Sequence, residues 1–193
     1  MLETTIDQFL GGRLQIQQPK QGYRAGVDPV LLAAAIPTKA SEDVLDLGCG
    51  VGVAALCLKS RVNDVNVTGL EIMPQLADLA KKNAERNALN IRVVEGDVAD
   101  LPFNLLQESF DHVMVNPPYF DREHGIPAQN LLKESARGGC TGLPIWVETA
   151  CRRVKNKGYV HFILRTERLP ELLRLLPQHM GSIEVTPIVS RDG

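Results

Sequence analysis

Short apolar segments alternate with amphipathic segments along most of this chain, at intervals of about 20–25 residues. The segments expected to form strands are residues 44–47, 65–70, 91–95, 112–115, 159–164 and 183–189. Helical spacing of apolar positions is expected over residues 53–59, 74–87, 142–154 and 166–176. Strands and helices that alternate in this way predict an α/β fold, with a mostly parallel sheet and helices on both of its faces.

Two regions depart from this alternation. The first 40 residues offer only a short β-like piece near residues 14–17 and a helix over about residues 28–35. The segment 120–141, which follows the fourth expected strand, is rich in charge, Gly and Pro. A connection of this length inside a compact domain usually has a functional role.

The composition excludes several classes of protein. The chain has 193 residues and a formal charge of −2, a size that favours one domain. Its hydrophobic content of 44% is too high for a disordered chain, and its longest apolar run, residues 30–36, is too short to span a bilayer. The four cysteines lack CxxC or zinc-ligand spacing, which favours reduced thiols and a cytoplasmic location. A slightly negative charge is compatible with a nucleic acid bound at a local patch.

A glycine-rich turn, residues 46–52 with the sequence Asp-Leu-Gly-Cys-Gly-Val-Gly, lies between the first expected strand of the sheet and the helix after it. Gly48, Gly50 and Gly52 allow a sharp turn and the close approach of a ligand. The dinucleotide pattern GxGxxG would need Gly at position 53, which is Val, and no Walker pattern is present. A tight turn without a ligand is the alternative interpretation.

Three carboxylates follow three expected strands. Glu71 comes about 20 residues after the glycines, where an acidic residue can accept hydrogen bonds from both ribose hydroxyls. Asp97 could meet the exocyclic amine of adenine, and Asp46 could face a cationic part of the ligand. Three negative charges would repel a pyrophosphate, but they suit S-adenosylmethionine, which combines a ribose, an adenine and positive charge. Each carboxylate alone is more often a helix cap or a solvated loop residue.

The tetrapeptide Asn116-Pro117-Pro118-Tyr119 closes the fourth expected strand. Two prolines can simply end a strand, but this explains neither the Asn nor the aromatic residue. The Asn116 side-chain oxygen and the Pro117 carbonyl could together accept both N–H bonds of one planar amino group. They would favour the pyramidal geometry in which the nitrogen lone pair points at an electrophile. Tyr119 could stack on the planar substrate, and no general base is needed before attack.

The glycine turn, Glu71, Asp97 and the Asn-Pro-Pro-Tyr motif resemble the successive motifs of class I S-adenosylmethionine-dependent amino-methyltransferases. The stretch from Gln18 to Asp28 is similar to the opening of the bacterial tRNA1(Val) (adenine-37-N6)-methyltransferase family. This resemblance implies a Rossmann-like fold, S-adenosylmethionine as cofactor and tRNA as partner. It also implies that Tyr23, Arg24 and Asp28 lie over the cofactor.

The resemblance further implies a single methyltransferase domain over residues 1–193, with residues 1–40 as a cap over the cofactor and 41–193 as the core. Chains of that family continue further and insert a final antiparallel strand between the fifth and sixth. We therefore expect that the C-terminal strand is missing and that residues 159–164 and 183–189 do not pair with each other. Unpaired edges of this kind would need further residues or another chain to cover them.

The Asn-Pro-Pro-Tyr motif does not define the substrate, because the same tetrapeptide occurs in enzymes that methylate DNA adenine, rRNA guanine N2 and the glutamine amide of release factors. Release-factor methyltransferases usually carry an N-terminal helical domain, for which about 40 residues leave little room. A catalytically silent module that binds S-adenosylmethionine is the alternative from another functional class.

Overall fold

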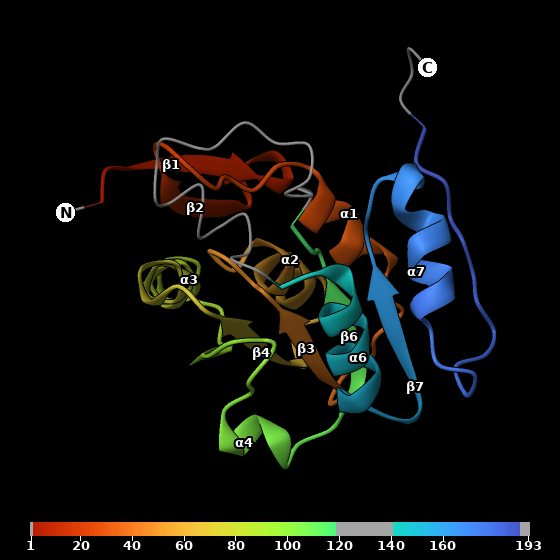
Figure 1. Ribbon diagram of the computed structural model, residues 1–193. Coiled ribbons are helices and arrows are strands. Elements are labelled where there is room, and N and C mark those ends of the chain that lie inside the picture. Colours follow the sequence, from red (N-terminus) through yellow and green to blue (C-terminus); the bar gives the residue numbers. More distant parts are fainter. Residues whose placement is uncertain (1, 119–140, 190–193) are drawn as a thin grey trace.

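The computed structural model of the chain describes residues 2–118 and 141–189 (Figure 1). Its centre is a sheet of five parallel strands in the order β5-β4-β3-β6-β7. The strands are β3 (Asp43–Leu47), β4 (Asn66–Glu71), β5 (Arg92–Glu95), β6 (Phe110–Val115) and β7 (Val154–Phe162). The predicted α/β class and five of the six predicted strands are therefore confirmed. The central strand β3 is buried on both faces, as a strand covered by helices on both sides must be.

Helices cover both faces of the sheet and build one apolar core on each. On one face, α1 (Asp28–Ala35), α2 (Val53–Arg61) and α3 (Pro74–Arg86) share a core with Val44 and Met114. On the other face, α4 (Phe103–Leu106), α6 (Leu143–Arg153) and α7 (Leu169–Leu175) share a core with Leu45 and Val113. Neighbouring residues of β3 thus point to opposite cores, which is the period of two that a strand imposes. The layers can be followed in Figure 1.

An antiparallel hairpin precedes this core. Its strands are β1 (Thr4–Phe9) and β2 (Leu14–Pro19), joined by the short 3₁₀ turn η1 (Leu10–Gly12). The sequence predicted the second strand and missed the first, because the polar residues of Thr4–Phe9 leave only a weak alternation of apolar positions. Leu14 and Ile16 of β2 are buried and join the core around α2 and α3, so the hairpin is fixed to the body of the protein.

The prediction of a sixth strand over residues 183–189 is wrong. These residues form no strand, and their apolar side chains at Ile183, Val185, Ile188 and Val189 are exposed. β-branched residues favour a strand only where a partner supplies hydrogen bonds, and this segment pairs with none of the described strands. As expected, it also does not pair with β7, which bonds only to β6 within the described residues.

Two smaller differences concern the C-terminal part of the sheet. β7 begins at Val154, directly after α6, because an irregularity lets Val154 pair with Phe110 and Tyr159 with His112. The predicted helix over residues 166–176 is divided into the 3₁₀ turn η3 (Thr166–Arg168) and α7. Across residues 2–118 and 141–189, no helix has both the length and the apolar character to cross a membrane.

Candidate functional site

The carboxyl ends of β3, β4 and β6 bring the sequence motifs to one edge of the sheet. The register pairs Leu47 with both Leu70 and Val115, so Gly48, Glu71 and Asn116 each follow at the same level. Ligand sites of open α/β sheets lie in this position, beyond the carboxyl ends of the strands. The parallel pairing is what assembles residues that lie far apart in the chain.

The glycine turn has a backbone that side chains rarely tolerate. Gly48, Gly50 and Gly52 have φ angles of +71°, +56° and +86°. A Cβ at Gly48 would lie 2.6 Å from the Cη2 atom of Trp146, and one at Gly50 would lie 2.9 Å from the Cε1 atom of Tyr23. At Gly48 and Gly50 the protein's own side chains therefore require glycine, whatever ligand binds beside the turn.

Glu71 is held against the glycine turn by two backbone N–H groups. Its Oε2 atom accepts a hydrogen bond from the Gly50 N–H and its Oε1 atom one from the Met73 N–H, both at 2.9 Å. The residue is only 6% exposed. Burial raises the pKa of the Glu71 carboxyl, while the N–H donors of Met73 and Gly50 lower it. Ile72, which follows at once, is 54% exposed and offers an apolar surface beside this carboxylate.

Asp46 is a buried carboxylate with an oxygen that lacks a partner. It is 2% exposed, and its Oδ2 atom takes part in no hydrogen bond in the described part of the chain. Burial raises its pKa to about 7, the Ala55 N–H opposes this shift, and the charge of Glu71 adds to it. A buried acid without a full set of partners is costly unless a cation or a proton satisfies it.

The three residues expected to lie over the cofactor, Tyr23, Arg24 and Asp28, have different surroundings. The Tyr23 ring lies against Gly50, and burial, followed by the charges of Asp46 and Glu71, raises the pKa of its hydroxyl. The Arg24 guanidinium is turned to the hairpin, where it donates to Asp7 Oδ2 at 2.6 Å. It also donates to Thr5 Oγ1 and to the Pro19 carbonyl, both at 2.8 Å. Asp28 lies at the first position of α1.

Of the remaining predicted site residues, the structure describes Asp97, Asn116 and Pro117. Asp97, half-buried, accepts a hydrogen bond from the Ala99 N–H at 2.9 Å, which is the turn geometry expected for a loop residue. Asn116 is half-buried and Pro117 is buried at the end of β6. The carbonyl of Pro118 accepts a hydrogen bond from Arg168 at 3.3 Å, so the loop before α7 contacts the tetrapeptide. Tyr119 and residues 120–140 of the long segment lie outside the described residues.

Sequence reasoning missed Trp146 and Ile72, which flank the glycine turn and Glu71. Trp146 is the single Trp of the chain and donates its Nε1–H to the Thr141 carbonyl at 3.3 Å. Its position in the first half of α6 gives no sign that its ring covers Gly48. Ile72 could have been noticed, because an exposed isoleucine directly after a strand-ending acid is an unusual place for an apolar side chain.

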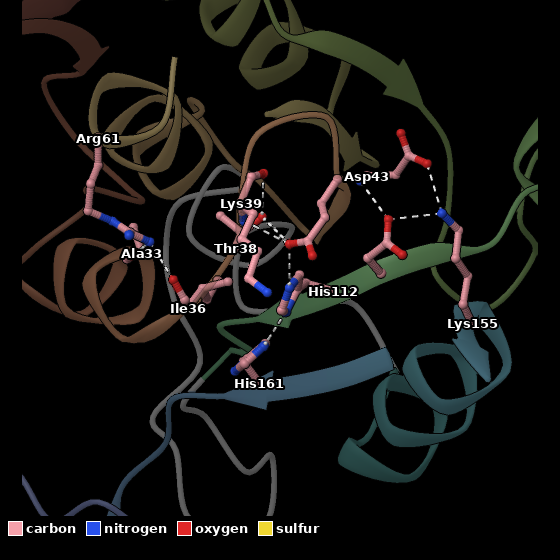
Figure 2. Close-up of polar contacts among 11 residues, drawn as sticks. Ala33, Ile36, Thr38, Lys39, Asp43, Arg61, His112, Lys155 and His161 are labelled. Carbon is pink, nitrogen blue, oxygen red and sulfur yellow. Dashed lines mark hydrogen bonds and ion pairs between the residues drawn. The ribbon is translucent and has the colours of Figure 1, made fainter. Parts of the chain in front are cut away.

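A second polar cluster lies away from this site, toward the amino ends of β3 and β6 (Figure 2). His112 Nε2 is 3.1 Å from Glu42 Oε2, and His112 Nδ1 is 3.0 Å from His161 Nε2. Nearby, Lys155 contacts the carboxylates of Asp43 and Asp111, each at 2.9 Å. Within the described ranges, no group of three or more His, Cys, Asp or Glu side chains is arranged to hold a metal ion.

Comparison with known proteins places this site in a family context. Residues 25–139 match the family model of the methyltransferase small domain. The tRNA1(Val) (adenine(37)-N6)-methyltransferase of Haemophilus influenzae is 30% identical over 84% of this chain and 70% of its own length. The protein of the same name from Actinobacillus succinogenes is 32% identical over 83% of this chain and 68% of its own length.

Among solved structures, a predicted O-methyltransferase from Agrobacterium tumefaciens superposes with a TM-score of 0.61 and 26% identity. The match covers 77% of this chain and 66% of that protein. The chain spans about two thirds of the length of each of these three proteins.

Proposed function

The chain belongs to the methyltransferase small domain family, and from this premise we propose that it methylates N6 of an adenine in tRNA with S-adenosylmethionine as the methyl donor. We place this reaction in the cytoplasm, and we propose tRNA1(Val), at the adenine next to the anticodon, as the substrate. The two relatives carry that activity in their names. The observation that carries the proposal is the meeting of Asn116, Glu71 and the glycine turn at one sheet edge.

The residues at this edge fit S-adenosylmethionine. Glu71 presents a carboxylate that can accept hydrogen bonds from the ribose hydroxyls, and the exposed Ile72 can pack against the adenine. The Oδ2 atom of buried Asp46 has no hydrogen-bond partner among the described residues, so a nearby positive charge would stabilise this carboxylate. The ammonium or sulfonium group of the cofactor would supply that charge. The glycine turn keeps its tight, left-handed backbone at the same sheet edge, so its peptide groups stand beside the Glu71 carboxylate, where the cofactor would bind. We assign Tyr23, Asp28 and Asp97 to the walls of the same pocket, and we assign Arg24 to the support of this wall through its bonds to the hairpin.

When bound, the cofactor supplies an electrophilic methyl group. The work of the chain's own residues is then to position the amine that attacks it. The Asn116 side-chain oxygen and the Pro117 carbonyl accept the two N–H bonds of the adenine amino group and orient its lone pair. Tyr119 stacks on the adenine ring, a contact worth roughly 1–3 kcal/mol for a nucleic-acid base. The proton leaves the amine after the methyl group has been transferred.

Methyl transfer from labelled cofactor to defined acceptors tests this function. The acceptors are tRNA1(Val) transcript without modifications, the same transcript with the adenine at position 37 replaced by guanine, and a bacterial release factor. We expect label in the first acceptor alone, recovered as N6-methyladenosine. Label in the release factor would instead show a glutamine methyltransferase. Cofactor binding without transfer to any of the three would favour a silent binding module.

A further inference from the structure

Two asparagines, Asn83 in α3 and Asn87 at its C-terminal cap, take the place of a neighbouring strand at the free edge of β2. Asn87 accepts a hydrogen bond from the Gln15 N–H at 2.8 Å and donates to the Gln15 carbonyl at 2.9 Å. Asn83 repeats this pair with Gln17, at 2.7 Å and 2.9 Å. Each carboxamide therefore behaves like the peptide group of a neighbouring strand. The hairpin lies beside α3 in Figure 1.

The rise per residue of α3 and of β2 explains why both asparagines can bond to β2 in the same way. Four residues of an α-helix rise about 6 Å along its axis, and two residues of a strand rise about 6.7 Å. A side chain in the last turn of α3 and the side chain four residues later, at the helix cap, can thus face alternate residues of β2. β1 bonds to the other edge of β2, so the two Asn side chains complete the hydrogen bonding of a two-stranded ribbon.

The two asparagines differ in their remaining N–H group. Asn87, the cap residue, directs it back to the carbonyl of Asn83 in the last turn of α3, at 2.7 Å. Asn83, which is 0% exposed, directs it to the carbonyl of Val51 at 3.0 Å. Val51 lies between Gly50 and Gly52, inside the glycine turn. Only Asn83 therefore joins the hairpin to the turn that we assign to the cofactor.

The hairpin in turn holds Tyr23 in place. The side chain of Gln18, buried next to Gln17, accepts a hydrogen bond from the Ala25 N–H at 2.9 Å and donates to Asp7 at 2.8 Å. Arg24 bonds to the same Asp7 oxygen. These bonds fix the residues on the C-terminal side of Tyr23, whose ring lies against Gly50. A displacement of β2 would therefore move Tyr23 relative to the turn.

We infer that Asn83 is a positioning residue that couples the docking of the N-terminal hairpin to the shape of the glycine turn. This inference rests on the assignment of the turn to S-adenosylmethionine. It predicts that affinity for the cofactor depends on Asn83 and much less on Asn87, although both asparagines hold the same strand. It also predicts that a ligand in the turn stabilises β2, because coupling between two sites is reciprocal.

Calorimetry with S-adenosylhomocysteine and amide hydrogen exchange measured by NMR test the inference on the full chain. Asn83→Ser, whose smaller side chain cannot span Gln17 and Val51 together, should weaken binding by about tenfold or more. The matched variant Asn87→Ala should change it by less than about threefold. In steady-state assays, Asn83→Ser should raise the KM for the methyl donor and leave kcat largely unchanged.

Hydrogen exchange separates coupling from a purely structural role of Asn83, because only coupling makes the protection of β2 depend on the ligand. In the wild-type protein, S-adenosylhomocysteine should slow exchange of the Gln17 N–H, which donates its hydrogen bond to Asn83 Oδ1. Asn87→Ala should keep this effect and Asn83→Ser should lose it. Equal losses of affinity in the two variants, or no ligand effect on Gln17 in the wild-type protein, would overturn the coupling. Failure of the wild-type protein to bind S-adenosylhomocysteine would instead overturn the cofactor assignment, and the coupling with it.

Discussion

The Oε2 atom of Glu71 accepts a hydrogen bond from the backbone N–H of Gly50 at 2.9 Å. This contact joins two motifs that lie 21 residues apart in the chain and end neighbouring strands. It fixes the carboxylate at the turn before any ligand binds, and its partner bond from the Met73 N–H holds the other oxygen. A preorganised carboxylate loses little conformational freedom on binding, which favours affinity.

Replacement of Glu71 by Ala should weaken binding of S-adenosylhomocysteine by at least about tenfold, because the acceptors proposed for the ribose hydroxyls are lost. Glu95 offers a matched control, since it is paired in register with Glu71 at the end of β5. Its side chain is exposed and forms a salt bridge with Lys81 at 3.2 Å. Titration calorimetry of Glu95→Ala should give the wild-type affinity. An equal loss in both variants would contradict the role assigned to Glu71.

Asp46 should make the unliganded protein less stable as the pH rises. Its folded pKa of about 7 lies above the ordinary value of 3.8, so the folded state binds more protons than the unfolded state between these values. Stability should therefore fall as the pH rises from about 4 to 7, and Asp46→Asn should remove this loss, on the order of 2–4 kcal/mol. Urea unfolding at pH 5 and pH 8 measures the difference. Asp64→Asn, at an exposed position, is the control and should behave like the wild type.

His161 should have the opposite effect on the pH dependence of stability, over a pH range that overlaps that of Asp46. Burial, followed by the charge of His112, lowers its pKa to about 4 from an ordinary value of 6.5. The folded state then binds fewer protons, so stability should be lost as the pH falls from about 6.5 to 4. His161→Gln keeps a group that can hydrogen-bond with His112 but cannot titrate, and it should reduce the loss of stability in acid by about 1–2 kcal/mol.

The control for this second titration is His179→Gln, because His179 is exposed. Its unfolding curves at pH 5 and pH 7.5 should follow those of the wild type. The effects of Asp46 and His161 partly cancel in the wild-type protein, so only the single variants separate them. A His161→Gln protein with unchanged acid sensitivity would show that the pair with His112 carries no such linkage.

Asn116→Ala should lower turnover by about 10²–10³-fold, by analogy with the removal of one preorganised group at a reacting centre. The lost oxygen would bind most strongly when the amine becomes pyramidal, so affinity for S-adenosylhomocysteine should change little. Single-turnover methylation of tRNA and calorimetry on the same variant give the two values. Lost cofactor binding with a normal rate at saturation would place Asn116 in the cofactor pocket instead.

The order of strands and helices and the motifs of the site are properties that the sequence determined by itself. Periods of 2 and 3.6 in the apolar positions are local, and the glycine turn, Glu71 and Asn116 each follow a strand that such a period identifies. Parallel pairing then requires these residues to meet at one edge of the sheet, so their proximity followed from the pattern. The segment 183–189 shows the limit of this reasoning, because a strand exists only with a partner.

Only the tertiary structure decided which side chains complete the site. Trp146 over Gly48 and Arg24 turned to Asp7 join residues 98 and 17 positions apart, and no local period encodes such pairs. The same holds for His112 beside His161 in the cluster away from the site. Asn83 and Asn87 have the spacing of any two residues one helical turn apart. Their role arises because β2, about 70 residues earlier, presents an unpaired edge to α3. Buried polar groups must find partners wherever the fold places them, and that placement is decided by packing.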